Sequence, residues 1–215
     1  MRSLEATALT VLARVAALKR DTDEARQLVR SANSITSDLG ESLTQAADCI
    51  TQALIEVIDD NLETAEDLLR SGYRQLEEMG GTRPRASVAA SLARVVYLRG
   101  RSDEAEELTR LCEQITPPDQ LDAQIRWRSV RAVTIARSEP EEAERLAKEA
   151  VHLADRTDQL DAQAEARIDL AEVLRLGGRR REAARELERA IDLYRAKGNE
   201  VGEGNASRLL RALEV

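Results

Sequence analysis

The chain has 215 residues, of which 42% are hydrophobic and only 2% aromatic, and its formal net charge at pH 7 is −8. This content is enough for a continuous core made of aliphatic side chains and alanine. The negative charge argues against a nucleic-acid surface as the main activity, and no segment approaches the roughly 20 apolar residues of a membrane-spanning helix. No leader segment is recognisable either, so we expect a cytoplasmic protein without a membrane partner.

Apolar residues recur at helical spacing along the whole chain. They predict eleven helices, at residues 2 to 19, 22 to 37, 41 to 58, 61 to 78, 84 to 99, 102 to 115, 119 to 136, 139 to 155, 158 to 176, 179 to 196 and 200 to 214. Several of these helices should end at glycines: Gly40, Gly80, Gly100, Gly178 and Gly198. Pro117 and Pro118 stop the sixth helix. Ser138, three residues before Glu141, predicts a capping box at the start of the eighth helix.

Small residues mark a repeat of about 40 residues. An alanine stands early in every second helix: Ala25, Ala65, Ala105, Ala143 and Ala183. Each has a partner near the middle of the preceding helix: Ala13, Ala53, Ala93, Ala132 and Ala171. Small residues at both positions permit close helix crossings. Another small slot follows seven residues after each second-helix alanine, and Cys112 occupies it in one unit, which favours a structural role for this cysteine.

Self-similarity at this period is typical of a helical solenoid, whose units share their core with their neighbours. We therefore predict an all-α, right-handed alpha-solenoid of five helical hairpins plus a C-terminal capping helix. The whole chain, residues 1–215, would be a single repeat domain. Its units are 2–38, 41–79, 84–116, 119–156 and 158–197, followed by the capping helix 200–214.

The two ends of the stack differ. The first helix is apolar on all sides, with Leu4, Val11, Val15 and Leu18 along one of them. Because a terminal repeat normally turns a polar face outward, we expect these four residues to contact either upstream repeats of a longer protein or a second copy of the chain. The last helix carries a single apolar stripe of Val201, Leu209, Leu210 and Leu213, as a capping helix should.

The alanine pairs, glycine stops and helix hairpins together resemble the tetratricopeptide repeat (TPR) family, although the period exceeds the family's usual one. The second half, from RGRSDEAEELTRL to DLAEVLRLGGRRREAARELERAIDLYRAKGN, is similar to the C-terminal repeat region of bacterial multidomain adenylate/guanylate cyclases and ATPase-containing transcriptional regulators. The resemblance implies a module that senses or recruits a regulator. No GxxxxGK[ST] phosphate loop and no paired-aspartate cyclase motif occur in the chain.

In such a stack the first helices line an inner groove, and groove positions can be counted from the small residue of each first helix. This counting predicts a mixed groove whose partner-binding residues are Arg14, Arg94, Tyr97, Arg126, Glu172 and Arg175. Arginine beside tyrosine suits a peptide that carries carboxylates. The acidic side of the groove would hold Glu165, Asp169 and Glu172.

Nothing in the sequence predicts catalysis. The one histidine, His152, has no second histidine and no cysteine at metal-ligand spacing, and no nucleophile stands with a base. The prediction is therefore a non-catalytic module, without metal or cofactor, that binds protein or peptide as the regulatory or scaffolding arm of a bacterial signalling protein. Two alternatives stay open: homodimerisation through the apolar first helix, and sensing of a small-molecule effector.

Overall fold

The computed structural model describes residues 1–213, and all regular structure in this range is helical. The helices are α1 (Arg2–Leu18), α2 (Thr22–Asp38), α3 (Ser42–Ala47), α4 (Cys49–Ile58), α5 (Leu62–Glu78), α6 (Thr82–Leu98), α7 (Ser102–Ile115), α8 (Leu121–Ile135), α9 (Pro140–Ala154), α10 (Leu160–Leu176), α11 (Arg180–Lys197) and α12 (Glu200–Leu213). None of these helices is both long enough and apolar enough to cross a membrane.

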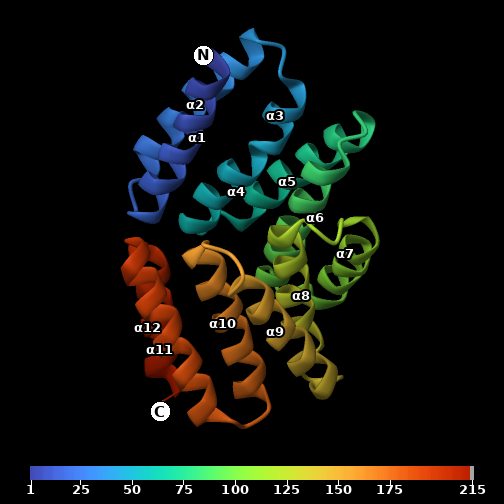
Figure 1. Ribbon diagram of the computed structural model, residues 1–215, viewed down its shortest axis with the longest axis vertical. Coiled ribbons are helices and arrows are strands. Elements are labelled where there is room, and N and C mark those ends of the chain that lie inside the picture. Colours follow the sequence, from blue (N-terminus) through green and yellow to red (C-terminus); the bar gives the residue numbers. More distant parts are fainter. Residues whose placement is uncertain (214–215) are drawn as a thin grey trace.

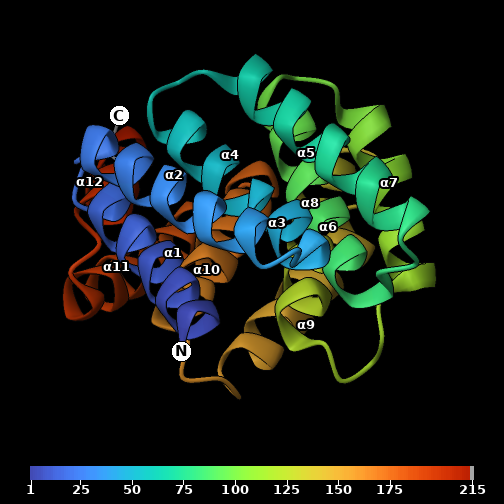
Figure 2. The same ribbon diagram turned by 90° about the horizontal axis from the view of Figure 1, so that it is seen from above.

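The helices form the predicted right-handed solenoid. Each second helix packs on the first helix of its unit, as α7 does on α6 and α9 on α8, and α12 closes the stack against α11. The ribbon curves strongly (Figure 1), and the first hairpin returns to the neighbourhood of the last helix (Figure 2). Helices α1 and α12 are in contact, so the two ends of the stack nearly close a ring.

The paired alanines lie at the crossings, as the repeat pattern predicts. All ten have 3% or less of their surface exposed: Ala13, Ala25, Ala53, Ala65, Ala93, Ala105, Ala132, Ala143, Ala171 and Ala183. The small-residue position seven residues after each second-helix alanine is also closely packed. At Gly72, an added Cβ would lie 2.9 Å from the Ala46 carbonyl oxygen. Small side chains at these points allow adjacent backbones to approach closely, which sets how the hairpins nest.

The helix ends confirm one prediction and correct another. Gly40, Gly80, Gly100, Gly178 and Gly198 all take the left-handed conformation, with φ between 69° and 79°, which a side chain would disfavour. The predicted capping box at Ser138 does not form. The hydroxyl of Ser138 instead donates to the Ile135 carbonyl of the preceding helix, and Glu139 occupies the N-cap of α9.

The third predicted helix, at residues 41 to 58, is not continuous but is broken at Asp48 into α3 and α4. At the break the Thr51 amide donates to the Asp48 carbonyl three residues earlier, a tighter turn than that of an α-helix. One Asp48 carboxylate oxygen is buried without a hydrogen-bond partner, and burial raises the pKa of this carboxyl to about 6. The second unit therefore contains a kink where the sequence analysis predicts one continuous helix.

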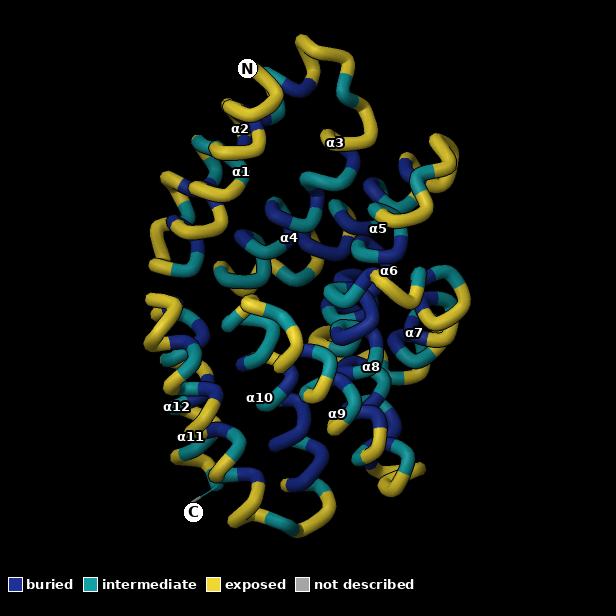
Figure 3. Tube along the Cα trace, in the orientation of Figure 1, coloured by how far each residue is buried: buried dark blue, intermediate teal, exposed yellow. Residues whose placement is uncertain are grey.

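Burial is uneven along the stack. Figure 3 shows dark, buried backbone along α6, α8 and α10, whereas α1 is largely exposed. The expected outward face of α1 is present, with Leu4 74%, Val11 55% and Val15 43% exposed, whereas Leu18 is half-buried. On α12 the apolar stripe is only partly right, because Gly202 and Ala206 supply the buried contacts and Leu209 is 44% exposed.

Candidate functional site: a central cavity inside the curved stack

The curvature of the stack forms an open cavity of about 250 Å³. It is lined mainly by α1, α4, α6, α8 and α10, the inner helices of the five units, and Leu69 of α5 also reaches it. One side chain near the end of the chain also reaches the cavity, Asn199 in the turn before α12. The site is therefore assembled from the first hairpin, the middle of the stack and its closing turn.

One part of the cavity wall is apolar. It is formed mainly by α1, α4 and α6, which contribute Leu18, Ile50, Leu54, Val57, Val95 and Leu98. Leu54 and Val57 occupy groove positions counted from Ala53, one and four residues after it. The other four lie outside the counted positions, and two of them, Leu18 and Leu98, share one repeat position, five residues after Ala13 and Ala93. An apolar wall of this kind favours ligands with apolar surface, because contact with the wall removes that surface from water.

The rest of the wall is charged, and its most buried group is an ion pair between α6 and α10. Arg94 Nη1 donates to Asp169 Oδ1 at 2.8 Å, and Nη2 makes a second contact with Oδ2. Burial alone would lower the pKa of Arg94, but the Asp169 carboxylate outweighs burial and raises it. The bidentate pair joins two inner helices that are not sequence neighbours in the stack. Arg94 is therefore a structural tie and not the free groove cation that the sequence analysis expected.

Three charged side chains of the wall have no such partner within residues 1–213: Arg14, Arg126 and Glu165. Arg126 on α8 is half-buried and Glu165 on α10 is exposed, and neither makes a hydrogen bond or an ion pair with the described protein. Both also line a smaller hollow of about 20 Å³ between α8 and α10. Nearby, Asp161 accepts a hydrogen bond of 2.8 Å from Asn199 Nδ2. Arg14, at the rim on α1, is exposed.

The structure brings some of the predicted groove residues together and separates others. Arg14, Arg94 and Arg126 line the central cavity. Tyr97 and Glu172 line a separate hollow near the ends of α6, α8 and α10. Arg175 donates to both Glu172 carboxylate oxygens, at 2.6 and 2.7 Å, so these two residues neutralise each other. The expected arginine and tyrosine cluster is therefore not one site.

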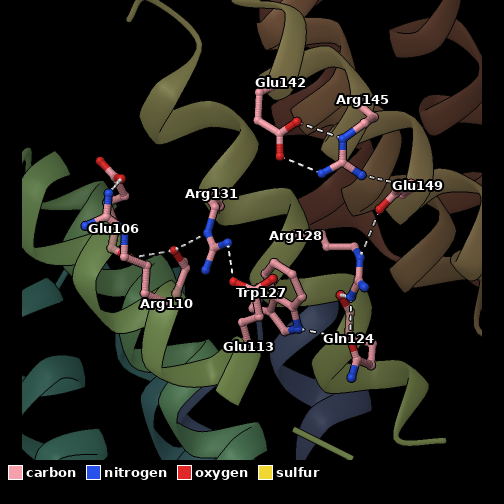
Figure 4. Close-up of polar contacts among 11 residues, drawn as sticks. Glu106, Arg110, Glu113, Gln124, Trp127, Arg128, Arg131, Glu142, Arg145 and Glu149 are labelled. Carbon is pink, nitrogen blue, oxygen red and sulfur yellow. Dashed lines mark hydrogen bonds and ion pairs between the residues drawn. The ribbon is translucent and has the colours of Figure 1, made fainter. Parts of the chain in front are cut away.

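Trp127, the one tryptophan of the chain, is only 2% exposed. Its indole nitrogen donates to Gln124 Oε1 at 3.1 Å, and the guanidinium carbons of Arg128 and Arg131 lie 4.2 and 4.7 Å from the ring centre (Figure 4). Arg131 in turn donates to Glu113 of α7 at 2.7 Å. Stacked cations and a satisfied indole fix Trp127 between helices, so it offers no free surface to a partner.

The two cysteines and the one histidine are side chains that could act as nucleophiles or metal ligands. Cys49 and Cys112 are buried free thiols, and burial raises the pKa of each to about 12, with Asp48 adding to the effect at Cys49. A nucleophilic cysteine requires the opposite shift. His152 is exposed on α9. Among the described residues no group of three His, Cys, Asp or Glu side chains could hold a metal ion.

Comparison with known proteins supports the fold. No family model matches the sequence, and no curated protein matches it. Among solved structures, the nearly identical TPR-like repeats of a putative kinesin light chain from Podosopora anserina superimpose with a TM-score of 0.56 at 20% identity, covering 93% of this chain and 99% of that one. BtubC (BKLC) from P. vanneervenii gives 0.55 at 18% identity, covering 94% and 89%. The chain thus has a TPR-like repeat fold.

Proposed function

We propose that the chain is a non-catalytic repeat module that binds a protein or peptide segment in its inner groove. It would act in the cytoplasm as the regulatory or scaffolding arm of a bacterial signalling protein. The observation that carries the proposal is the groove itself: inner helices of all five units face one cavity whose wall joins apolar and unpaired charged side chains. The TPR-like fold supports it, because other repeats of this fold form interaction surfaces.

The groove offers a peptide two kinds of contact. Leu98, which is 47% exposed, lies at the cavity together with half-buried Leu18 and Leu54, and these can take apolar side chains. Arg126 has no protein partner in residues 1–213 and can take a carboxylate in a charge-assisted hydrogen bond. The bacterial signalling context rests on the resemblance of the second half to repeat regions of cyclases and regulators.

The test is selection of binders from a displayed library of random peptides, followed by affinity measurement in solution. We expect Arg126→Glu to weaken the selected peptides about tenfold or more, since it reverses a central contact. Arg30→Glu is the matched control, because Arg30 is exposed on α2, outside the cavity. If both variants bound the selected peptides equally well, the result would contradict peptide binding in the groove.

Homodimerisation through α1 is the second candidate, favoured by the exposure of Leu4, Val11 and Val15 on one helix face. An apolar face of this kind normally marks a contact surface. Sedimentation velocity at micromolar concentration tests it directly. A dimer that dissociates in Val11→Glu would support a contact through α1, whereas a monomer at all concentrations would exclude it.

A further inference from the structure

The wall of the central cavity contains both positive and negative side chains. Arg94 and Asp169 neutralise each other, and Arg14 is exposed on α1, which leaves Arg126 and Glu165 on the inner helices without partners in the described chain. A ligand with one charge would satisfy one of these two side chains and leave the other unsatisfied. A ligand with both charges would satisfy both through charge-assisted hydrogen bonds.

The position of this charged pair relative to the apolar wall restricts the ligand further. Arg126 and Glu165 project from adjacent inner helices, α8 and α10, and both line the smaller hollow of about 20 Å³, which has room for about one water-sized group. The apolar wall of α1, α4 and α6 completes the same cavity. The complementary ligand therefore carries its two charges close together at one end and an apolar body at the other.

The volume limits the size of that ligand. At about 250 Å³ the cavity is smaller than the roughly 300–1,000 Å³ of sites for drug-sized molecules. We propose that the central cavity binds a free α-amino acid with an aliphatic side chain. Its carboxylate pairs with Arg126, its ammonium group pairs with Glu165, and its side chain lies among Leu54, Val57, Val95 and Leu98. This ligand site goes beyond the proposed peptide-binding function and does not depend on it.

Binding in this cavity connects both ends of the stack. Arg14 and Leu18 of α1 and Asn199 before α12 all line it, and α1 already contacts α12. A ligand held there binds the folded stack and not the unfolded chain, so it stabilises the fold. The amino acid would therefore raise the melting temperature, and the rise would continue with the logarithm of its concentration above Kd.

The test is calorimetric titration of the full chain with leucine, isoleucine and methionine, followed by analogues that each lack one feature. Isocaproate lacks the ammonium group, isoamylamine lacks the carboxylate, and N-acetyl-leucinamide lacks both charges and mimics an internal peptide residue. We expect the free amino acids to bind and every analogue to bind at least about tenfold more weakly, the factor that about 1.4 kcal/mol represents. Equal binding of isocaproate or of N-acetyl-leucinamide would overturn the proposal.

Two variants identify the contacts. With Arg126→Met, leucine and isoamylamine should bind equally, because the carboxylate no longer has a partner. With Glu165→Gln, leucine and isocaproate should converge for the corresponding reason. Arg30→Met should leave the preference for leucine unchanged, and circular dichroism verifies that all three variants fold. If no free amino acid binds the wild-type chain the proposal is wrong, whereas peptide capture in the groove is measured independently and can still succeed.

Discussion

Helices α1 and α6 occupy equivalent positions in their hairpins and have the same length, 17 residues each, but they are buried to different extents. Four side chains of α1 are buried, all of them alanines, whereas nine of α6 are, including Val88, Leu92 and Val96. The reason is their neighbours: α6 packs against α5, α7 and α8, whereas α1 has α2, part of α4 and the edge of α12.

Helices with the same repeat motif are therefore packed differently in the middle of the stack and at its start. In the middle of the stack each inner helix is held from both sides, and a buried ion pair between Arg94 and Asp169 adds a connection across α8. In the first two units the core is smaller, the α3–α4 segment is kinked at Asp48, and apolar side chains of α1 face outward. We expect substitutions to have large effects in the middle of the stack and small ones on α1.

Removing the cation of the buried pair should have the largest effect. Arg94→Met leaves the Asp169 carboxylate, 8% exposed, without its partner. We expect a loss of about 3–5 kcal/mol in the free energy of unfolding, because an uncompensated charge stays buried. Urea denaturation measures it.

Two further variants test whether the stability loss at Arg94 comes from the buried ion pair. The double variant Arg94→Met with Asp169→Leu should lose less than the single one, since no buried charge remains. Arg110→Met removes a surface pair with Glu106, 64% exposed on the arginine side, and should cost at most about 0.5 kcal/mol. A loss at Arg94 no greater than at Arg110 would mean that the pair does not tie the inner helices together.

The contact between α5 and the kinked segment should be the next most sensitive. In Gly72→Ala the new methyl group would lie 2.9 Å from the Ala46 carbonyl oxygen and closer still to Cys49 Sγ. Helix propensity favours alanine by about 1 kcal/mol, but overpacking against backbone costs about 1–3 kcal/mol. We expect a net loss of up to about 2 kcal/mol in thermal or urea unfolding. Adding Cys49→Ala should recover part of it, and a stabilised single variant would contradict the close approach.

These two sites show what the sequence could and could not predict. The period of the alanines predicts the solenoid because every unit needs a small residue at each crossing, and Gly72 falls in that register. Groove counting placed Arg14, Arg94 and Arg126 at the cavity for the same reason. It could not predict that Asp169 neutralises Arg94, since that pair spans 75 residues and depends on the curvature of the stack. The break at Asp48 was not predicted, because both halves of the segment are helical.

Asp48 offers a stabilising change in the weaker region. Burial raises its pKa from 3.8 to about 6, so the folded chain holds a proton that the unfolded chain releases. Stability from this group is complete below about pH 4 and is lost as pH rises through 6. Asp48→Asn should therefore gain about 1–2 kcal/mol at pH 7, less than the full linkage value because the amide must also be buried. Unfolding measured from pH 4 to 7 should show the gain shrinking toward the acid end, and a gain independent of pH would contradict a titrating Asp48.

The smallest effect should come from the outward face of α1. Val11 is 55% exposed, so Val11→Ser removes little contact and should change the free energy of unfolding by no more than about 0.5 kcal/mol. Val88 is a fully buried valine on α6, and Val88→Ser should cost about 2–3 kcal/mol through lost contact and a buried hydroxyl. This difference between Val11→Ser and Val88→Ser is expected only while the chain is monomeric. If Val11→Ser lowers the melting temperature at high protein concentration but not at low concentration, α1 is covered by a second copy, and the difference between α1 and α6 belongs to the free chain alone.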